Sequence, residues 1–115
     1  MSLNVDIQES EGSVIFLLKG KLCNEGDSLI LNDLIEKEIE TGMHQIIFDL
    51  SELKNCNSSG LNILIRPLTK TRTKNGDTVV CGVNKTLDQL LSITKLNEIF
   101  SLYPNQKEAL KHFKQ

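Results

Sequence analysis

Short apolar runs alternate along the chain with longer segments in which apolar residues recur every three or four positions. A weak apolar–polar alternation over Val5–Glu9 predicts an edge strand. Continuous apolar runs predict buried strands, because a strand covered on both faces has no polar side. These runs are Ser13–Leu18 (ended by Gly20), Ile46–Leu50, Thr78–Val83 and a last, short Ile99–Leu102.

The intervening segments have helical periodicity. Asn24 is a suitable N-cap for a first helix that ends at Thr41-Gly42. After a loop at 54–57, Ser58 or Ser59 is expected to cap a second helix that ends at Asn75-Gly76. A short third helix is predicted around Leu87–Leu91, and a terminal helix is expected with Pro104 in its first turn and Ala109, Leu110 and Phe113 on its apolar side.

The order of these elements predicts an α/β fold, because strands separated by helices pair in parallel. We expect a central mixed sheet of four to five strands with about four helices. The 115 residues suit one domain that spans 1–115.

Composition and charge narrow the classes of function. The formal net charge is −2, so no basic surface is expected that could bind a nucleic acid or an anionic membrane. Aromatic residues are scarce at 4%, which argues against base stacking. No apolar stretch approaches the ~20 residues of a membrane helix, so no membrane insertion is expected. Three scattered cysteines and an N-terminus without a signal-like apolar run favour the cytoplasm.

Candidate chemistry is concentrated in one segment, Asn57-Ser58-Ser59-Gly60-Leu61, which follows a buried strand and opens a helix. Sites in open α/β sheets form beyond the carboxyl ends of strands, where helix N-termini present free amides. Gly60 is expected to let another chain approach the backbone closely. Taken alone, these residues are also an ordinary helix cap. Local pattern by itself favours the cap.

The segment resembles the Asp-Ser-Ser/Thr-Gly-Leu loop of STAS domains, the family of bacterial anti-sigma factor antagonists. Other similar features are Gly20-Lys21-Leu22 after the second predicted strand, Gly76-Asp77 before the fourth, and the leucine pattern at Leu87, Leu90-Leu91, Leu96 and Phe100. The resemblance covers roughly Val5 to Leu110. Two positions depart from the family pattern, because Asn57 and Cys23 stand where Asp is usual.

The resemblance implies a protein that binds a kinase-like anti-sigma factor and is switched off when that partner phosphorylates Ser58. It implies a partner surface made of Cys23, Asn24, Asn57, Ser58, Ser59, Gly60 and Leu61. No cofactor, metal site or direct nucleic-acid contact is expected. The oligomeric state expected is a monomer or weak dimer.

Two alternatives remain open at this point. STAS domains also serve as non-phosphorylated binding subunits of transporters, and the changes at Cys23 and Asn57 favour that role more than a standard sequence would. A hydrolase that uses Ser58 is the least favoured, because the chain has no Gly-x-Ser-x-Gly motif and neither His44 nor His112 has a triad context. Both histidines are expected to be solvated. Cys56 is expected to be inert, with a redox-sensitive thiol as the other interpretation.

Overall fold

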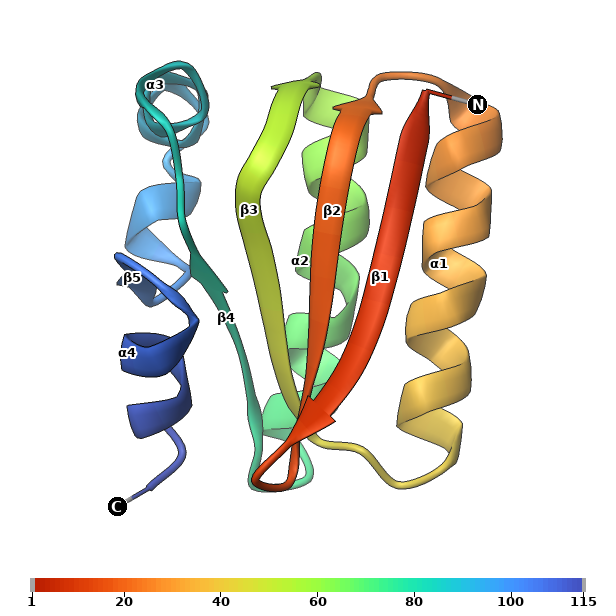
Figure 1. The fold of residues 1–115 in the computed structure, drawn as a ribbon, viewed down its shortest axis with the longest axis vertical. Helices are drawn as coiled ribbons and strands as arrows, with labels where there is room; N and C mark the ends of the chain where they lie inside the picture. Colours follow the sequence, from red (N-terminus) through yellow and green to blue (C-terminus); the bar gives the residue numbers. More distant parts are fainter. Residues whose placement is uncertain (1, 115) are drawn as a thin grey trace.

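A five-stranded mixed sheet forms the centre of the molecule, in the order β1-β2-β3-β4-β5. The computed structural model describes residues 2–114. The strands are β1 (Leu3–Ser10), β2 (Ser13–Leu22), β3 (Gln45–Cys56), β4 (Asp77–Cys81) and β5 (Leu102–Tyr103). β1 and β2 form an antiparallel hairpin, and the remaining neighbours pair in parallel (Figure 1). The predicted mixed α/β fold is confirmed.

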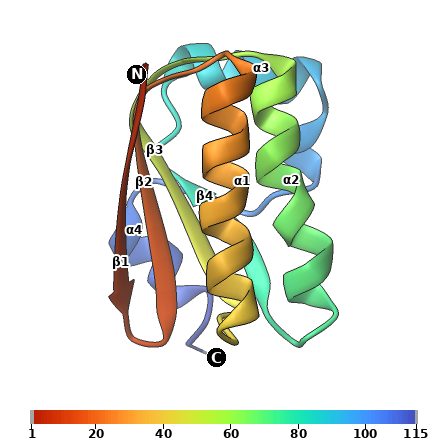
Figure 2. The ribbon, with the colours of Figure 1, turned by 90° about the vertical axis from the view of Figure 1, so that its right-hand side faces the viewer.

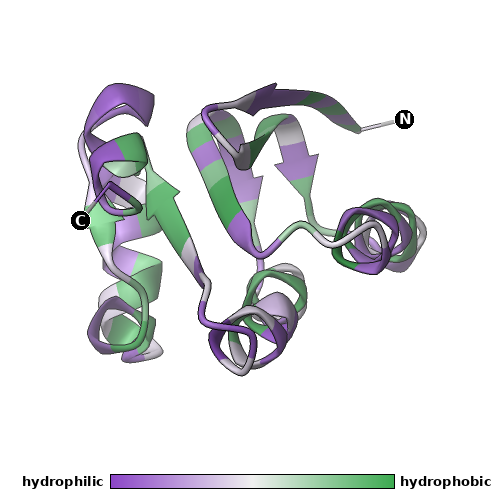
Figure 3. Ribbon diagram, turned by 90° about the horizontal axis from the view of Figure 1, so that it is seen from below, coloured by the Kyte–Doolittle hydropathy of each residue, from purple (hydrophilic) through white to green (hydrophobic). Residues whose placement is uncertain are grey.

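Helices lie on both faces of the sheet. α1 (Glu25–Glu40) and α2 (Ser58–Arg72) run side by side over one face, and α4 (Gln106–Lys111) lies over the other (Figure 2). α3 (Lys85–Ile93) and the 3-10 turn η1 (Leu96–Glu98) follow β4. Viewed along the strands, α1 and α2 each carry both hydrophilic and hydrophobic segments, as expected for helices with one side on the sheet (Figure 3).

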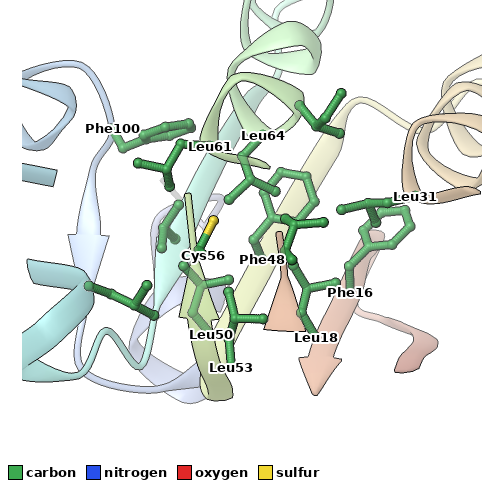
Figure 4. Close-up of a cluster of buried hydrophobic side chains, with 14 of the residues drawn as sticks. Phe16, Leu18, Leu31, Phe48, Leu50, Leu53, Cys56, Leu61, Leu64 and Phe100 are labelled. Carbon is green, nitrogen blue, oxygen red and sulfur yellow. The ribbon is translucent and has the colours of Figure 1, made fainter. Parts of the chain in front are cut away.

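The main apolar core lies between the sheet and the α1/α2 layer. Phe16 of β2 and Phe48 of β3 are fully buried at its centre, with ring centroids 5.5 Å apart (Figure 4). Leu31 of α1 and Leu64 of α2 pack over them. On the other face a smaller cluster joins Ile15, Ile47, Val79, Cys81 and Ala109. Successive residues of β2, β3 and β4 therefore serve different cores, which explains their continuous apolar runs.

The four α-helices within residues 2–114 all begin in the same way. An asparagine precedes each helix in extended conformation, and its side-chain oxygen accepts a hydrogen bond from the amide three residues later. The caps are Asn24, Asn57, Asn84 and Asn105. The prediction of Ser58 or Ser59 as the cap of α2 is therefore wrong, as is Pro104 in the first turn of α4, because Asn105 follows it and caps that helix.

β2 and β3 continue several residues beyond their predicted C-terminal ends. β2 passes through Gly20, which adopts a φ of 94° and lies against the carbonyl of Ser2, where a Cβ would clash. β3 continues to Cys56 through what was expected to be a loop. The pairing of β2 with β3 shifts register between Leu17 and Lys19 and again between Gly20 and Lys21. Each shift leaves one extra residue in β3, as in a β-bulge. The last strand is shorter and later than predicted, at Leu102–Tyr103 instead of Ile99–Leu102.

No helix within residues 2–114 combines the length and the apolar character needed to cross a membrane.

Candidate functional site

The carboxyl ends of β2 and β3 and the N-termini of α1 and α2 meet at one edge of the sheet. Leu22 pairs with Cys56 across the two parallel strands. Each strand is followed by an asparagine cap, so the two helices start next to each other (Figure 2). Parallel pairing thus brings the segments around Cys23 and Ser58 together although they are far apart in the sequence.

Asn57 connects the two segments. Its Oδ1 accepts a hydrogen bond of 2.8 Å from the Gly60 amide, and its Nδ2 donates one of 2.9 Å to the Cys23 carbonyl. The Asn57 amide also donates to the Leu22 carbonyl at 3.4 Å. An aspartate could cap α2 but has no N–H to offer Cys23. The departure from the usual Asp therefore adds a link between the two loops.

Asn24 is engaged mainly with its own helix. Its Oδ1 accepts from the Asp27 amide at 2.8 Å, and its Nδ2 donates to Asp27 Oδ2 at 2.9 Å and to Ser2 Oγ at 3.1 Å. The Ser2 hydroxyl also donates to the buried Asp27 carboxylate. This cluster fixes the start of α1. Sequence reasoning did not find the bond between Ser2 and Asp27, because the two residues are 25 positions apart.

Ser58 and Ser59 form the exposed first turn of α2. Among the hydrogen bonds of residues 2–114, neither hydroxyl has a protein partner, because Asn57 has taken the capping role. Both hydroxyls therefore face solvent at the positive end of a 15-residue helix. That is a position at which an added anion is stabilised.

Gly60 and Leu61 lie beneath this turn. Both are buried, and a Cβ on Gly60 would meet the Leu22 carbonyl and would come within 2.9 Å of Cys56 Sγ. Gly60 was expected to let another chain approach the backbone. The close approach is instead made by β2 of the same chain, and Gly60 and Leu61 position the serines above them.

A cleft of about 420 Å³ separates the first turns of α1 and α2. Its walls combine polar groups with two aliphatic side chains, the buried Ile63 and Leu29, which is 55% exposed. It is lined by Cys23, Asn24, Glu25, Ser28, Leu29, Asn57, Ser59, Asn62, Ile63 and Arg66. Sequence reasoning missed Glu25, Ser28, Leu29, Asn62, Ile63 and Arg66, although the last three follow Ser59 at helical spacing and so share its side of α2.

The thiol at the end of β3 is poorly ionised. Burial, together with a smaller effect of the nearby Cys23, raises the pKa of Cys56 to about 12. Its Sγ lies 3.4 Å from the Asn57 carbonyl. At neutral pH Cys56 is therefore a protonated thiol buried in the core, whereas Cys23 is partly exposed in the cleft.

His112 does not belong to this site and is not solvated, so that prediction is wrong. Its Nδ1 is hydrogen-bonded to the Tyr103 hydroxyl at 2.6 Å, and its Nε2 lies 2.8 Å from Asp77 Oδ2. His44 precedes β3 and is partly buried, with a buried Nδ1 that has no hydrogen-bond partner within residues 2–114. Over the same residues, no group of three His, Cys, Asp or Glu side chains is placed to hold a metal ion.

Comparison with known proteins identifies the family of this chain and several relatives. The model of the STAS domain family matches residues 4–109, so the chain belongs to the STAS domain family. An anti-sigma F factor antagonist of Paenibacillus polymyxa is 26% identical over 110 residues, which cover 96% of this chain and 94% of the relative.

Solved structures share the fold at lower identity. An anti-sigma factor antagonist from Mycobacterium paratuberculosis superposes with a TM-score of 0.88 at 21% identity, covering 99% of this chain and 96% of that one. The Bacillus cell fate determinant SpoIIAA in its phosphorylated form gives a TM-score of 0.74 at 17% identity, covering 95% of this chain and 98% of the other.

Proposed function

We propose that this protein is an anti-sigma factor antagonist. It binds a kinase-like anti-sigma factor through the surface around Cys23, Asn24, Asn57, Ser58 and Ser59, with Gly60 and Leu61 supporting that surface from below. Phosphorylation of Ser58 by the partner weakens the complex.

The observation that carries the proposal is the state of Ser58. Ser58 is the exposed first residue of α2, and its hydroxyl has no hydrogen-bond partner among the described residues. Its neighbours Asn57 and Ser59 line the cleft between the two helices. A kinase needs an accessible hydroxyl with nothing to displace. The curated relative is an anti-sigma F factor antagonist, and SpoIIAA is known in a phosphorylated form, which supports the same interpretation.

The negative charge of a phosphate on Ser58 would be enough to switch off partner binding without refolding the domain. A phosphate on Ser58 adds about −1.5 to −2 charge at neutral pH. Because the group sits at the N-terminus of α2, the helix dipole and free amides tolerate it. The penalty therefore falls on the partner, whose surface would face a new, poorly paired charge. Asn57 and Cys23 carry no carboxylate, so the unmodified surface at these two positions is neutral.

The test is phosphorylation by a purified kinase-like anti-sigma factor with ATP, followed by intact-mass analysis and mapping of the phosphate. We expect one phosphate on the wild type and on Ser59→Ala, and none on Ser58→Ala. Ser58→Glu is expected to bind the partner at least tenfold more weakly than Ser58→Ala, about 1.4 kcal/mol.

Labelling of Ser58→Ala, or equal binding by Ser58→Glu and Ser58→Ala, would contradict the switch. Stable capture of a transporter by the wild type, with no phosphate gained from any anti-sigma kinase, would favour the transporter-subunit role instead.

A further inference from the structure

Two of the three cysteines lie at neighbouring strand ends. Leu22 is the pairing partner of Cys56 in the parallel β2–β3 ladder, and Cys23 is the residue that directly follows β2. Parallel strands are about 4.8 Å apart and rise about 3.3 Å per residue, so a residue one step beyond Leu22 in ideal strand geometry would have its Cα about 6 Å from that of Cys56. Disulfides span Cα distances of about 4.4–6.8 Å.

Both residues border the helix-covered side of the sheet. Cys56 belongs to the core beneath α2, next to Leu61 and Gly60 (Figure 4). Cys23 lines the cleft between the N-termini of α1 and α2. The thiols are close enough for a charge on Cys23 to contribute to the raised pKa of Cys56. The Asn57 side chain holds the Cys23 carbonyl at the same junction, which limits how far the two residues can separate.

We propose that Cys23 and Cys56 form a reversible disulfide when the protein meets a hydroperoxide. The partly exposed Cys23 thiolate attacks the peroxide, the O–O bond breaks, and hydroxide leaves and is protonated to water. Cys23 is then a sulfenic acid. The sulfur of Cys56 attacks the Cys23 sulfur, the S–O bond breaks, and a second water leaves with the Cys56 proton. Two thiols and one hydrogen peroxide give one disulfide and two waters.

The two cysteines have different roles because their surroundings differ. Cys23 is open to the cleft and meets the oxidant first, whereas Cys56 is 7% exposed and serves as the resolving thiol. Because burial raises the pKa of Cys56 to about 12, its thiolate fraction increases as the pH rises toward that value, and the second step should accelerate in the same direction. Cys81 cannot substitute, because it is buried in the smaller core on the opposite face.

The bond would tie the end of β2 to the end of β3 directly beneath Asn57 and the serine turn. It would also remove a thiol from the wall of the cleft. The chemistry involves only this chain and a peroxide, so it does not depend on whether the protein binds an anti-sigma factor.

The test treats the purified, fully reduced protein with hydrogen peroxide at low protein concentration, followed by intact-mass analysis and peptide mapping without reductant. We expect a loss of two hydrogen atoms, about 2 Da. A peptide pair linked through Cys23 and Cys56 should appear and should vanish on addition of dithiothreitol. Cys81→Ala should behave as the wild type does, and Cys23→Ser should show no mass loss. Formation of the linked pair should accelerate from about pH 7 to pH 9.

Three results would overturn the proposal. The first is oxidation of Cys23 to a sulfinic acid, a gain of about 32 Da, with Cys56 still free. The second is a covalent dimer through Cys23 in place of the internal link, and the third is a mass loss that Cys81→Ala abolishes. Because the linked peptides are mapped in the wild type, the folding of the Cys23→Ser variant does not decide the outcome.

Discussion

The two faces of the sheet are built by different means. The face beneath α1 and α2 is closed by a continuous apolar core with Phe16 and Phe48 at its centre. The face beneath α4 has only a small apolar cluster. A chain of polar contacts supplements it there, from Tyr103 through His112 and Asp77 to Arg72, whose Nε donates to Asp77 Oδ1 at 2.9 Å.

The two faces therefore contribute differently to the molecule: one supplies most of the stability of the fold, and the other attaches α4 to the sheet. Apolar burial on the α1/α2 side fixes the strand ends and helix starts that carry the candidate site, so that site rests on the most stable part of the molecule. The six-residue α4 buries Ala109 and partly buries Leu110, and a hydrogen bond from Gln106 to Asp49 adds to its attachment. Each hydrogen bond of this kind contributes less to the free energy of unfolding than a buried apolar side chain does. The bonds that the Asp77 carboxylate accepts also depend on pH.

The largest effect is expected from Phe48→Ala, which opens a cavity in the main core. Loss of a buried Phe costs about 3–5 kcal/mol of unfolding free energy. Urea denaturation would measure it, with the exposed Leu29→Ala as a control expected to stay within about 0.5 kcal/mol. A Phe48→Ala cost below that of the Tyr103→Phe change described below would contradict the ranking of the two faces.

A smaller effect is expected from Gly60→Ala, because the new Cβ would meet the Leu22 carbonyl and the backbone cannot easily yield. Overpacking of this kind costs about 1–3 kcal/mol. The matched control is Gly26→Ala in the first turn of α1, where a Cβ finds only an ordinary contact of 3.5 Å with Asn24 Oδ1. That variant should be neutral or stabilised by up to about 1 kcal/mol. Equal changes in thermal midpoint for the two variants would contradict the close packing of Gly60 against the Leu22 carbonyl.

Asn57→Ala removes the cap of α2 and the link to Cys23 together. A lost cap costs about 0.5–2 kcal/mol. Asn57→Asp keeps the acceptor for the Gly60 amide but loses the donor to the Cys23 carbonyl. Chemical denaturation should therefore place Asn57→Asp between the wild type and Asn57→Ala. If the two variants were equally destabilised, the capping bond would not be the main contribution of this side chain.

The smallest effect concerns the α4 side. Tyr103→Phe removes the hydroxyl bonded to His112 and should cost about 0.5–1.5 kcal/mol of unfolding free energy.

Partial burial alone would raise the pKa of Asp77, but the Thr78 amide, His112 and Arg72 together lower it below 3.8. Its contribution is therefore complete above that value and is lost as the pH falls through the lowered pKa. Between roughly pH 5 and pH 2, Asp77→Asn should lose less stability than the wild type. Parallel curves for the two proteins would exclude this role of Asp77.

Much of the fold could be predicted from the sequence, because local pattern decides it. Continuous apolar runs indicated β2, β3 and β4, and helical periodicity indicated the two helices of the main core. β3 was predicted to end early because its continuous apolar run stops at Leu50. Leu50, Leu53 and Cys56 all reach the same core at a spacing of three, which the two register shifts make possible. A bulge depends on the neighbouring strand and leaves no period in the sequence.

The candidate site was predicted in position but not in detail. Asn and Ser are both good caps, so local preference could not assign the cap to Asn57. The bond from Asn57 to the Cys23 carbonyl, a partner from another loop, was equally hidden. His112 was misjudged for the same reason, since its partner Asp77 lies on a distant strand. Contacts between distant segments explain the last two of these errors.

The parallel pairing of β2 with β3 also has a kinetic consequence. Its partners are roughly thirty residues apart in sequence, with all of α1 between them, so a loop must close before any of the pairing is gained. The surface around Asn57 and Cys23 is assembled only when that loop has closed. A chain that has been synthesised through β2 but not β3 presents half of it, and an unfolded chain presents none, so the partner binding proposed above would also require that β2 and β3 have paired.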